Sequence, residues 1–186
     1  MTAQELIQSL QLAPHPEGGF FRETYRAAGS IACDALPNSF GGDRVFSTSI
    51  YYLLQAEQVS TLHRIKSDEL WHFHMGDALE VIEITPDGTL TTTVLGHDVA
   101  AGNTLQSVVP AGRWFGARLA TPATDAFALV GCTVAPGFDF ADFEIADRDA
   151  LLKAFPQHAA IITAMTRVAG VDVVGEKRTG RDSNPR

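Results

Sequence analysis

The sequence predicts an all-β fold in which short antiparallel strands close into a barrel or a sandwich. Between residues 45 and 134, short extended segments follow one another, separated by turns rich in Gly, Pro, Asn and Asp. No helical segment lies between these strands, and parallel strands would need helical crossovers. The pattern therefore favours an antiparallel barrel and excludes a parallel α/β sheet.

The first element is a short amphipathic helix over residues 2–12. Its apolar residues recur at helical spacing, and Thr2 and Glu5 have the spacing of a capping box. Two prolines and two glycines within residues 14–19 end this helix, because neither residue type continues one.

The remaining elements follow from alternation and turn residues. Residues 30–43 are predicted to be a loop. The pattern after Asp147 predicts two short helices, or one helix broken at Pro156. One domain is expected over residues 1–169, and the polar residues 170–186 are expected to be a disordered tail. The predicted strands are 20–25, 45–54, 59–64, 69–75, 79–85, 90–95, 105–109, 113–119 and 126–134.

Composition excludes several classes of protein. With 14 Lys and Arg against 22 Asp and Glu, the net charge is −8, which disfavours nucleic-acid binding. No apolar run is long enough to cross a membrane and no signal-peptide layout is present, so we expect no membrane partner and a cytoplasmic protein. Cys33 and Cys132 lie far apart in the sequence and are expected to be free thiols.

The polar and aromatic residues of segment 63–76 indicate a functional site. By strand alternation, Glu69, Trp71 and Phe73 share one face, and His72 and His74 share the other. A carboxylate on an otherwise apolar face must be hydrogen-bonded, paired or used, since burying it alone is costly.

A short turn over residues 66–68 separates His63 from Glu69, so we expect a hairpin that places the two side chains nearly opposite each other. One interpretation is an acid–base pair, with His63 as the general base. The other is that the two residues only satisfy each other inside the barrel. The candidate catalytic residues are therefore His63 and Glu69, and the expected ligand contacts nearby are Thr61, Trp71, Phe73, Tyr51 and Phe115.

Two further features bear on ligand binding. Of the arginines in the β region, Arg118 is expected to contact an anionic group if it faces the cavity. Glu17 lies in the loop His15-Pro16-Glu17-Gly18-Gly19, which is either a tight corner or a segment that reaches over the mouth of the barrel.

The segment with His63, Glu69 and Gly76 resembles the first cupin motif, and Gly102 with Pro110-Ala111-Gly112 resembles the second. Thr61 and Phe115 stand where cupins carry two metal-binding histidines. Blocks over residues 6–145 are similar to the uncharacterised cupin family known as domain of unknown function 985. They are His15–Phe20, Ser49–Leu54, Leu62–Arg64, Ser67–Phe73, Val109–Gly112 and Gly131–Phe140.

The resemblance implies a cupin double-stranded β-helix, or jelly roll, with a short N-terminal helix and C-terminal helices, commonly paired as a homodimer. Members of the family are similar in shape to deoxysugar-nucleotide epimerases, which work without a metal. Of the four ligand positions of a cupin metal centre, only two hold a metal-binding residue in this chain, His63 and Glu69. We therefore expect no metal cofactor.

Three functional classes stay open. The first is a metal-independent isomerase or epimerase acting on a small anionic or sugar-like molecule. The second is a non-catalytic module that binds a small ligand in the same barrel. The third is a metal-dependent cupin oxygenase or isomerase.

Overall fold

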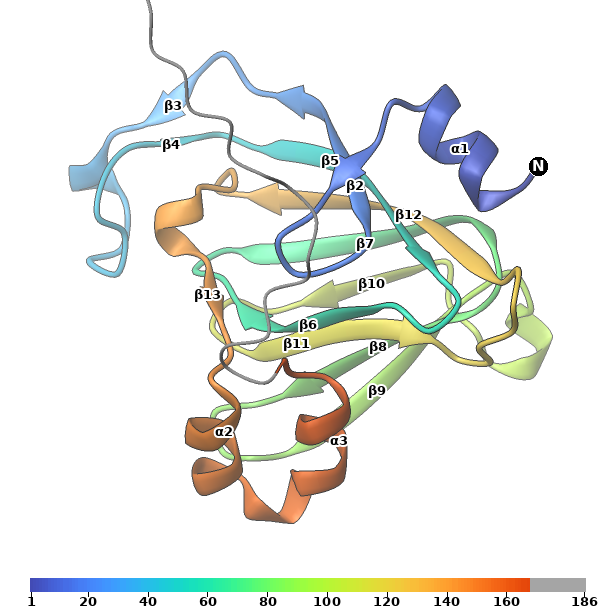
Figure 1. The fold of residues 1–186 in the computed structure, drawn as a ribbon. Coiled ribbons are helices and arrows are strands. Elements are labelled where there is room, and N and C mark those ends of the chain that lie inside the picture. The colour runs from blue at the N-terminus through green and yellow to red at the C-terminus, as the bar shows by residue number, and fades with distance from the viewer. Residues whose placement is uncertain (168–186) are drawn as a thin grey trace, which may run out of the picture.

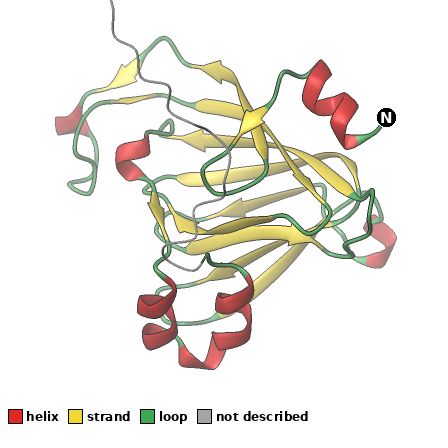
Figure 2. Ribbon diagram, viewed as in Figure 1, coloured by secondary structure: helices red, strands yellow, loops and turns green. Residues whose placement is uncertain are grey.

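Two antiparallel sheets form the body of the protein in a computed structural model that describes residues 1–167 (Figures 1 and 2). The first has six strands in the order β1 (Ala13–Pro14), β2 (Phe20–Arg26), β5 (Thr48–Gln55), β12 (Phe127–Ala135), β7 (Asp68–Gly76) and β10 (Gln106–Val109). The second has five in the order β13 (Glu144–Ile145), β6 (Val59–Arg64), β11 (Trp114–Leu119), β8 (Leu79–Ile84) and β9 (Leu90–Leu95). This is the predicted double-stranded β-helix.

Most strand boundaries agree with the prediction, and β6 and β9 agree to the residue. The predicted strand 45–54 is divided, because β4 (Arg44–Val45) pairs with β3 (Ser30–Ile31) and leaves the larger sheet. The predicted loop 30–43 therefore contains a two-residue strand, and a 3₁₀ turn, η1 (Cys33–Ala35), follows it. Two-residue strands are too short to show alternation. The expected tail over 170–186 lies outside the described residues.

The predicted hairpin between His63 and Glu69 is wrong. β6 pairs with β11 and β13 in one sheet, whereas β7 pairs with β12 and β10 in the other. The residues between these two strands carry the chain from one sheet to the other. A turn this short fits both a hairpin and such a crossing, so its length did not discriminate between them.

Helix α1 (Ala3–Ser9) covers part of the outer face of the six-stranded sheet (Figure 1). The predicted capping box is present: the Glu5 backbone N–H donates to the Thr2 hydroxyl, and the Thr2 backbone N–H donates to the Glu5 carboxylate. Leu6 packs on Leu53 and Leu129 of the sheet. The capping box stabilises the N-terminal end of the helix, and burial of the apolar face holds the helix against the sheet.

The C-terminal helices α2 (Arg148–Ala154) and α3 (Ala159–Ala164) are separated by the 3₁₀ turn η4 (Pro156–His158), as the proline predicted. Leu151, Ile162 and Met165 pack on Leu62 and Ile82 at the outer face of the five-stranded sheet. No helix within residues 1–167 is long and apolar enough to cross a membrane.

Between the sheets lies the main core, where Tyr52, Trp71 and Phe115 are almost completely buried. Burying side chains of this size stabilises the fold by about 1.5–3 kcal/mol each. These rings fill one part of the barrel interior and leave a cavity beside them.

Candidate functional site

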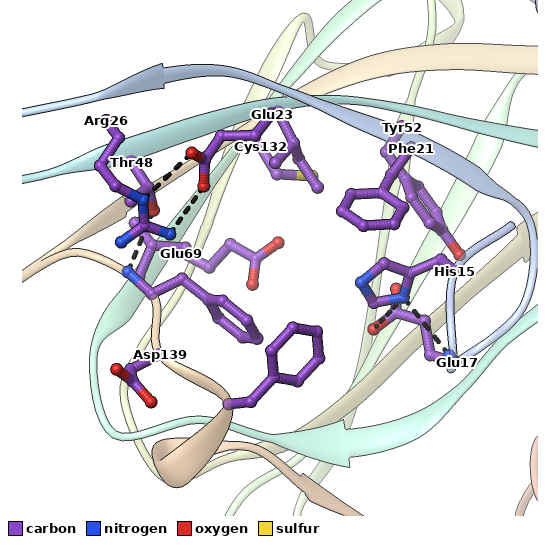
Figure 3. A pocket seen from close by; sticks show the side chains of 14 residues that line it. His15, Glu17, Phe21, Glu23, Arg26, Thr48, Tyr52, Glu69, Cys132 and Asp139 are labelled. Carbon is purple, nitrogen blue, oxygen red and sulfur yellow. Dashed lines mark hydrogen bonds and ion pairs between the residues drawn. The ribbon is translucent and has the colours of Figure 1, made fainter. Parts of the chain in front are cut away.

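A cavity of about 220 Å³ opens inside the barrel against the inner face of the six-stranded sheet (Figure 3). Strand register brings its residues together, since Glu23 and Cys132 both pair with Ile50, and Glu69 pairs with Val134. The opposite walls come from the N-terminal loop at His15 and from the segment that follows β12. The aliphatic and phenylalanine side chains in the lining are Phe21, Ile50, Val134, Phe138 and Phe140.

Glu69 projects into this cavity from β7 and is only 8% exposed. Burial raises the pKa of the Glu69 carboxyl to about 8, and the negative charge of Glu17 adds to the rise. A hydrogen bond with the Cys132 thiol acts in the opposite direction and is too weak to offset burial. At neutral pH Glu69 is therefore mostly protonated, with a pKa close to the working pH of an acid–base catalyst.

Glu17 is buried on the other side of the cavity, at the end of the N-terminal loop. Its Oε1 accepts a hydrogen bond from the Ser60 hydroxyl at 2.9 Å, and its Oε2 lies 3.2 Å from His63 Nε2. Its carbonyl accepts from the Thr61 N–H at 2.9 Å. The loop is thus fixed to β6, so it both turns the chain and reaches into the barrel.

Gly18 allows this close approach of the loop to β6. Its φ is +116°, and a Cβ at this position would lie 2.2 Å from the Val59 carbonyl oxygen. The Tyr52 hydroxyl also donates to the Gly18 carbonyl at 2.8 Å. Only glycine fits both the backbone angle and the space.

His63 has both ring nitrogens engaged within the protein. Nδ1 lies 2.8 Å from the Thr61 carbonyl, which can only accept, so Nδ1 carries a proton. Nε2 faces Glu17, and a hydrogen bond there requires one further proton, on either the imidazole or the carboxyl group. The ring is also packed against Phe115 and Phe143, with centroid distances of 4.1 and 5.3 Å. These contacts favour a supporting role over the role of general base expected from the sequence.

His15 faces Glu69 across the cavity (Figure 3). Its Nδ1 accepts a hydrogen bond from the Glu17 backbone N–H at 3.3 Å and also lies 3.5 Å from Glu17 Oε2 (Figure 3). With Nδ1 as the acceptor, the neutral ring carries its proton on Nε2. Burial lowers the pKa of His15, although the charge of Glu17 opposes this, and the ring is neutral at pH 7. In Figure 3 the second ring nitrogen of His15 points toward the space beside Glu69.

The other residues predicted to contact a ligand are dispersed. Trp71, Phe73 and Phe115 belong to the packed core beside the cavity, and the Trp71 indole N–H has no partner among the described residues. Thr61 is fully buried, and its hydroxyl also lacks a partner there. Tyr51 lies outside the cavity, with its ring 5.8 Å from that of His74.

The arginines do not converge on the cavity. Arg118 donates to Glu80 at 2.7 Å, Arg64 to Glu144 at 2.7 Å, and Arg113 to Glu83 at 3.0 Å, and none of these residues lines the cavity. Arg22 lies over the Tyr51 ring. Of the residues that line the cavity, sequence analysis predicted only Glu17 and Glu69. It missed the others: His15, Phe21, Glu23, Arg26, Thr48, Ile50, Tyr52, Cys132, Val134, Phe138, Asp139 and Phe140. The only signal for His15 was its place beside Glu17 in the Pro- and Gly-rich loop.

The side chains do not fit a cupin metal centre. Within residues 1–167, no three His, Cys, Asp or Glu side chains come together in a way that could hold a metal ion. Phe115, which stands where the resemblance places a histidine ligand, packs its ring on His63. The two cysteines are free thiols, Cys33 exposed and Cys132 buried.

Comparison with known proteins identifies clear relatives. Residues 4–146 match the family described as Cupin superfamily (DUF985). The uncharacterized protein YML079W of Saccharomyces cerevisiae is 33% identical over 147 residues, which is 75% of this chain and 72% of that protein. Among solved structures, protein SO0799 from Shewanella oneidensis is 42% identical with a TM-score of 0.80, covering 90% of this chain and 98% of that one. A hypothetical protein from Leishmania major is 37% identical with a TM-score of 0.81, covering 89% and 99%.

Proposed function

Because the chain belongs to the DUF985 family of cupins, and its barrel places a carboxyl group and an imidazole on one cavity, we propose that it binds a small carbonyl compound and moves a proton on it without a metal ion. One observation carries this proposal. A buried carboxyl group with a pKa of about 8 faces the second ring nitrogen of a neutral histidine across a cavity with several apolar side chains in its walls.

Glu69 is the proposed base. At pH 7 about a tenth of it is ionised, and a carboxylate with so high a pKa is a strong base for a proton next to a carbonyl group. His15 donates its Nε2–H to the carbonyl oxygen, where negative charge develops as the proton leaves. Such a neutral donor stabilises the enolate through a hydrogen bond to its oxygen.

The fate of the proton sets the reaction class. With a 2-hydroxy carbonyl compound, Glu69 returns the proton to the former carbonyl carbon of the enediolate while the hydroxyl proton moves to the former carbonyl oxygen, and the product is an isomer. If a proton from water reaches the original carbon on the face opposite Glu69, and Glu69 later releases its own proton to water, the product is an epimer. Glu17 and His63 act as positioning residues, because the Glu17 backbone N–H fixes the tautomer of His15 and His63 holds the Glu17 side chain.

Exchange of carbon-bound hydrogen tests the proposal without a known product. The protein is incubated in D₂O with a panel of small ketones and hydroxyketones, and NMR follows replacement of C–H by C–D. We expect Glu69→Gln to slow the exchange by about 10²–10⁴-fold. The matched control is Glu144→Gln, which removes an exposed carboxylate outside the cavity and should leave the rate unchanged.

The alternatives give different results. Ligand binding with no exchange by the wild-type protein would indicate a non-catalytic binding module and refute the proposed activity. Exchange that stops when EDTA is added would refute the metal-independent mechanism.

We also propose a homodimer, as the family resemblance implies. β10 is an edge strand of the six-stranded sheet, and Val108 on it is 47% exposed, beside Leu105 at 51%. An exposed apolar edge invites pairing with another chain. Sedimentation at micromolar concentration should show a species of twice the chain mass, and a monomer alone would refute this.

A further inference from the structure

The charged groups of the cavity are strongly biased toward acids. Four carboxyl groups line it, from Glu17, Glu23, Glu69 and Asp139, against a single arginine, Arg26. The histidine that lines it, His15, is neutral because burial lowers its pKa. No other Lys or Arg within the described residues lines this cavity.

The single arginine is already occupied. Arg26 Nε and Nη2 donate to the two carboxylate oxygens of Glu23 at 3.0 and 2.7 Å. Both residues stand at the rim, where their side chains are 46% and 41% exposed. A bidentate pair uses the same donor fork that would bind the carboxylate or phosphate of a ligand.

The inner end of the cavity offers hydrogen-bond donors to an uncharged acceptor group of a ligand. The Nε2–H of His15 and the protonated Glu69 carboxyl both point into it. Each can donate to a carbonyl or hydroxyl oxygen, and neither brings a positive charge. An anionic group placed between them would find no positively charged group among the lining residues of this end and would lie near the Glu17 carboxylate.

We infer that this cavity selects uncharged carbonyl or hydroxy compounds over carboxylates and phosphates, and that Glu23 enforces the selection by occupying Arg26. This inference rests on the proposed use of the cavity as a ligand site. The sequence predicted a small anionic or sugar-like ligand, and this inference keeps only the uncharged, sugar-like compounds of that range.

A matched pair of ring compounds tests the inference by ligand-observed NMR titration at pH 7. Cyclohexanone and cyclohexanecarboxylate share a ring and differ in charge. We expect the ketone to bind the wild-type protein more than about tenfold more tightly than the carboxylate, because like charges repel in a desolvated cavity. Equal binding, tighter binding of the carboxylate, or no binding of the ketone would overturn the inference.

A gain of anion binding tests the role of Glu23. Glu23→Gln frees Arg26 at the rim, so the affinity for cyclohexanecarboxylate relative to cyclohexanone should rise several-fold. Glu80→Gln is the matched control, because it frees Arg118 from an equivalent 2.7 Å ion pair outside the cavity and should leave the ratio unchanged. An unchanged ratio in Glu23→Gln, or an equal rise in Glu80→Gln, would overturn the inference. Selective binding of the ketone without hydrogen exchange would refute the proposed catalysis alone.

Discussion

Glu69 should make the protein less stable as pH rises from about 4.5 to 8. The pKa of its carboxyl is about 8 in the folded protein, against an ordinary value of 4.5. Between these values the folded state holds a proton that the unfolded state has released. Raising the pH therefore favours unfolding, with a slope set by that one proton.

The magnitude follows from the size of the pKa difference. Each pKa unit corresponds to 1.36 kcal/mol, so the ionisable Glu69 costs about 3 kcal/mol of stability at pH 7, about 4 kcal/mol at pH 8 and about 5 kcal/mol well above pH 8. Glu69→Gln removes this cost, because the amide stays neutral at every pH. The advantage of the variant over wild type should therefore grow by a few kcal/mol between pH 5 and pH 8.

Urea denaturation of wild type, Glu69→Gln and Glu144→Gln at pH 5, 6, 7 and 8 measures this difference. The Glu144 variant controls for the loss of one carboxylate at an exposed position. A difference between Glu69→Gln and wild type that stays constant with pH, or shrinks as pH rises, would refute the buried high-pKa carboxyl. The proposed role of Glu69 as a base matched to neutral pH would fail with it.

Three further substitutions test how the site is held, each by urea denaturation at pH 7. Glu17→Ala should cost about 3–5 kcal/mol, because it leaves His63 buried without its acidic partner; a loss below 1 kcal/mol would contradict the buried pair. Gly18→Ala should cost more than about 2 kcal/mol, since φ is +116° and the new Cβ meets a backbone carbonyl. Gly41→Ala, where a Cβ would meet nothing within 4 Å, is its control, and equal losses would refute the close approach. Asp142→Ala should cost about 3–5 kcal/mol, because the buried guanidinium of Arg44 loses the carboxylate that binds it through both oxygens and keeps only backbone carbonyl acceptors; a neutral outcome would refute that pair.

Strand alternation predicted which side chains share a face but not which strands pair. It correctly placed Glu69, Trp71 and Phe73 on the inner face of β7. It could not show that the chain changes sheets between His63 and Glu69, because both arrangements use a short connection. Local sequence determines how side chains alternate along one strand. Which strands pair depends on contacts between distant segments, and no local pattern contains that information.

The partner of His63 could not be found from spacing for the same reason. Glu17 reaches it from an irregular loop, where no periodicity relates one side chain to another. The loop was recognisable from its prolines and glycines, and Glu17 was predicted to contact a ligand. That His15 faces Glu69 follows only from the way β2, β5, β12 and β7 stand side by side.

The loop that carries His15 and Glu17 also bears on the order of events during folding. Its anchors to β5 and β6 span 34 and 43 residues, and the bond between Phe138 and Thr48, beside the opposite wall, spans 90. Contacts between segments so far apart form late, because the entropy of closing long loops is lost before the contacts stabilise them. The cavity also requires β12 and the segment after it, which are synthesised after β5 and β6. Ligand binding at the proposed site would therefore follow completion of the whole barrel, because a partly folded chain lacks one wall of the cavity even where its helices and hairpins have already formed.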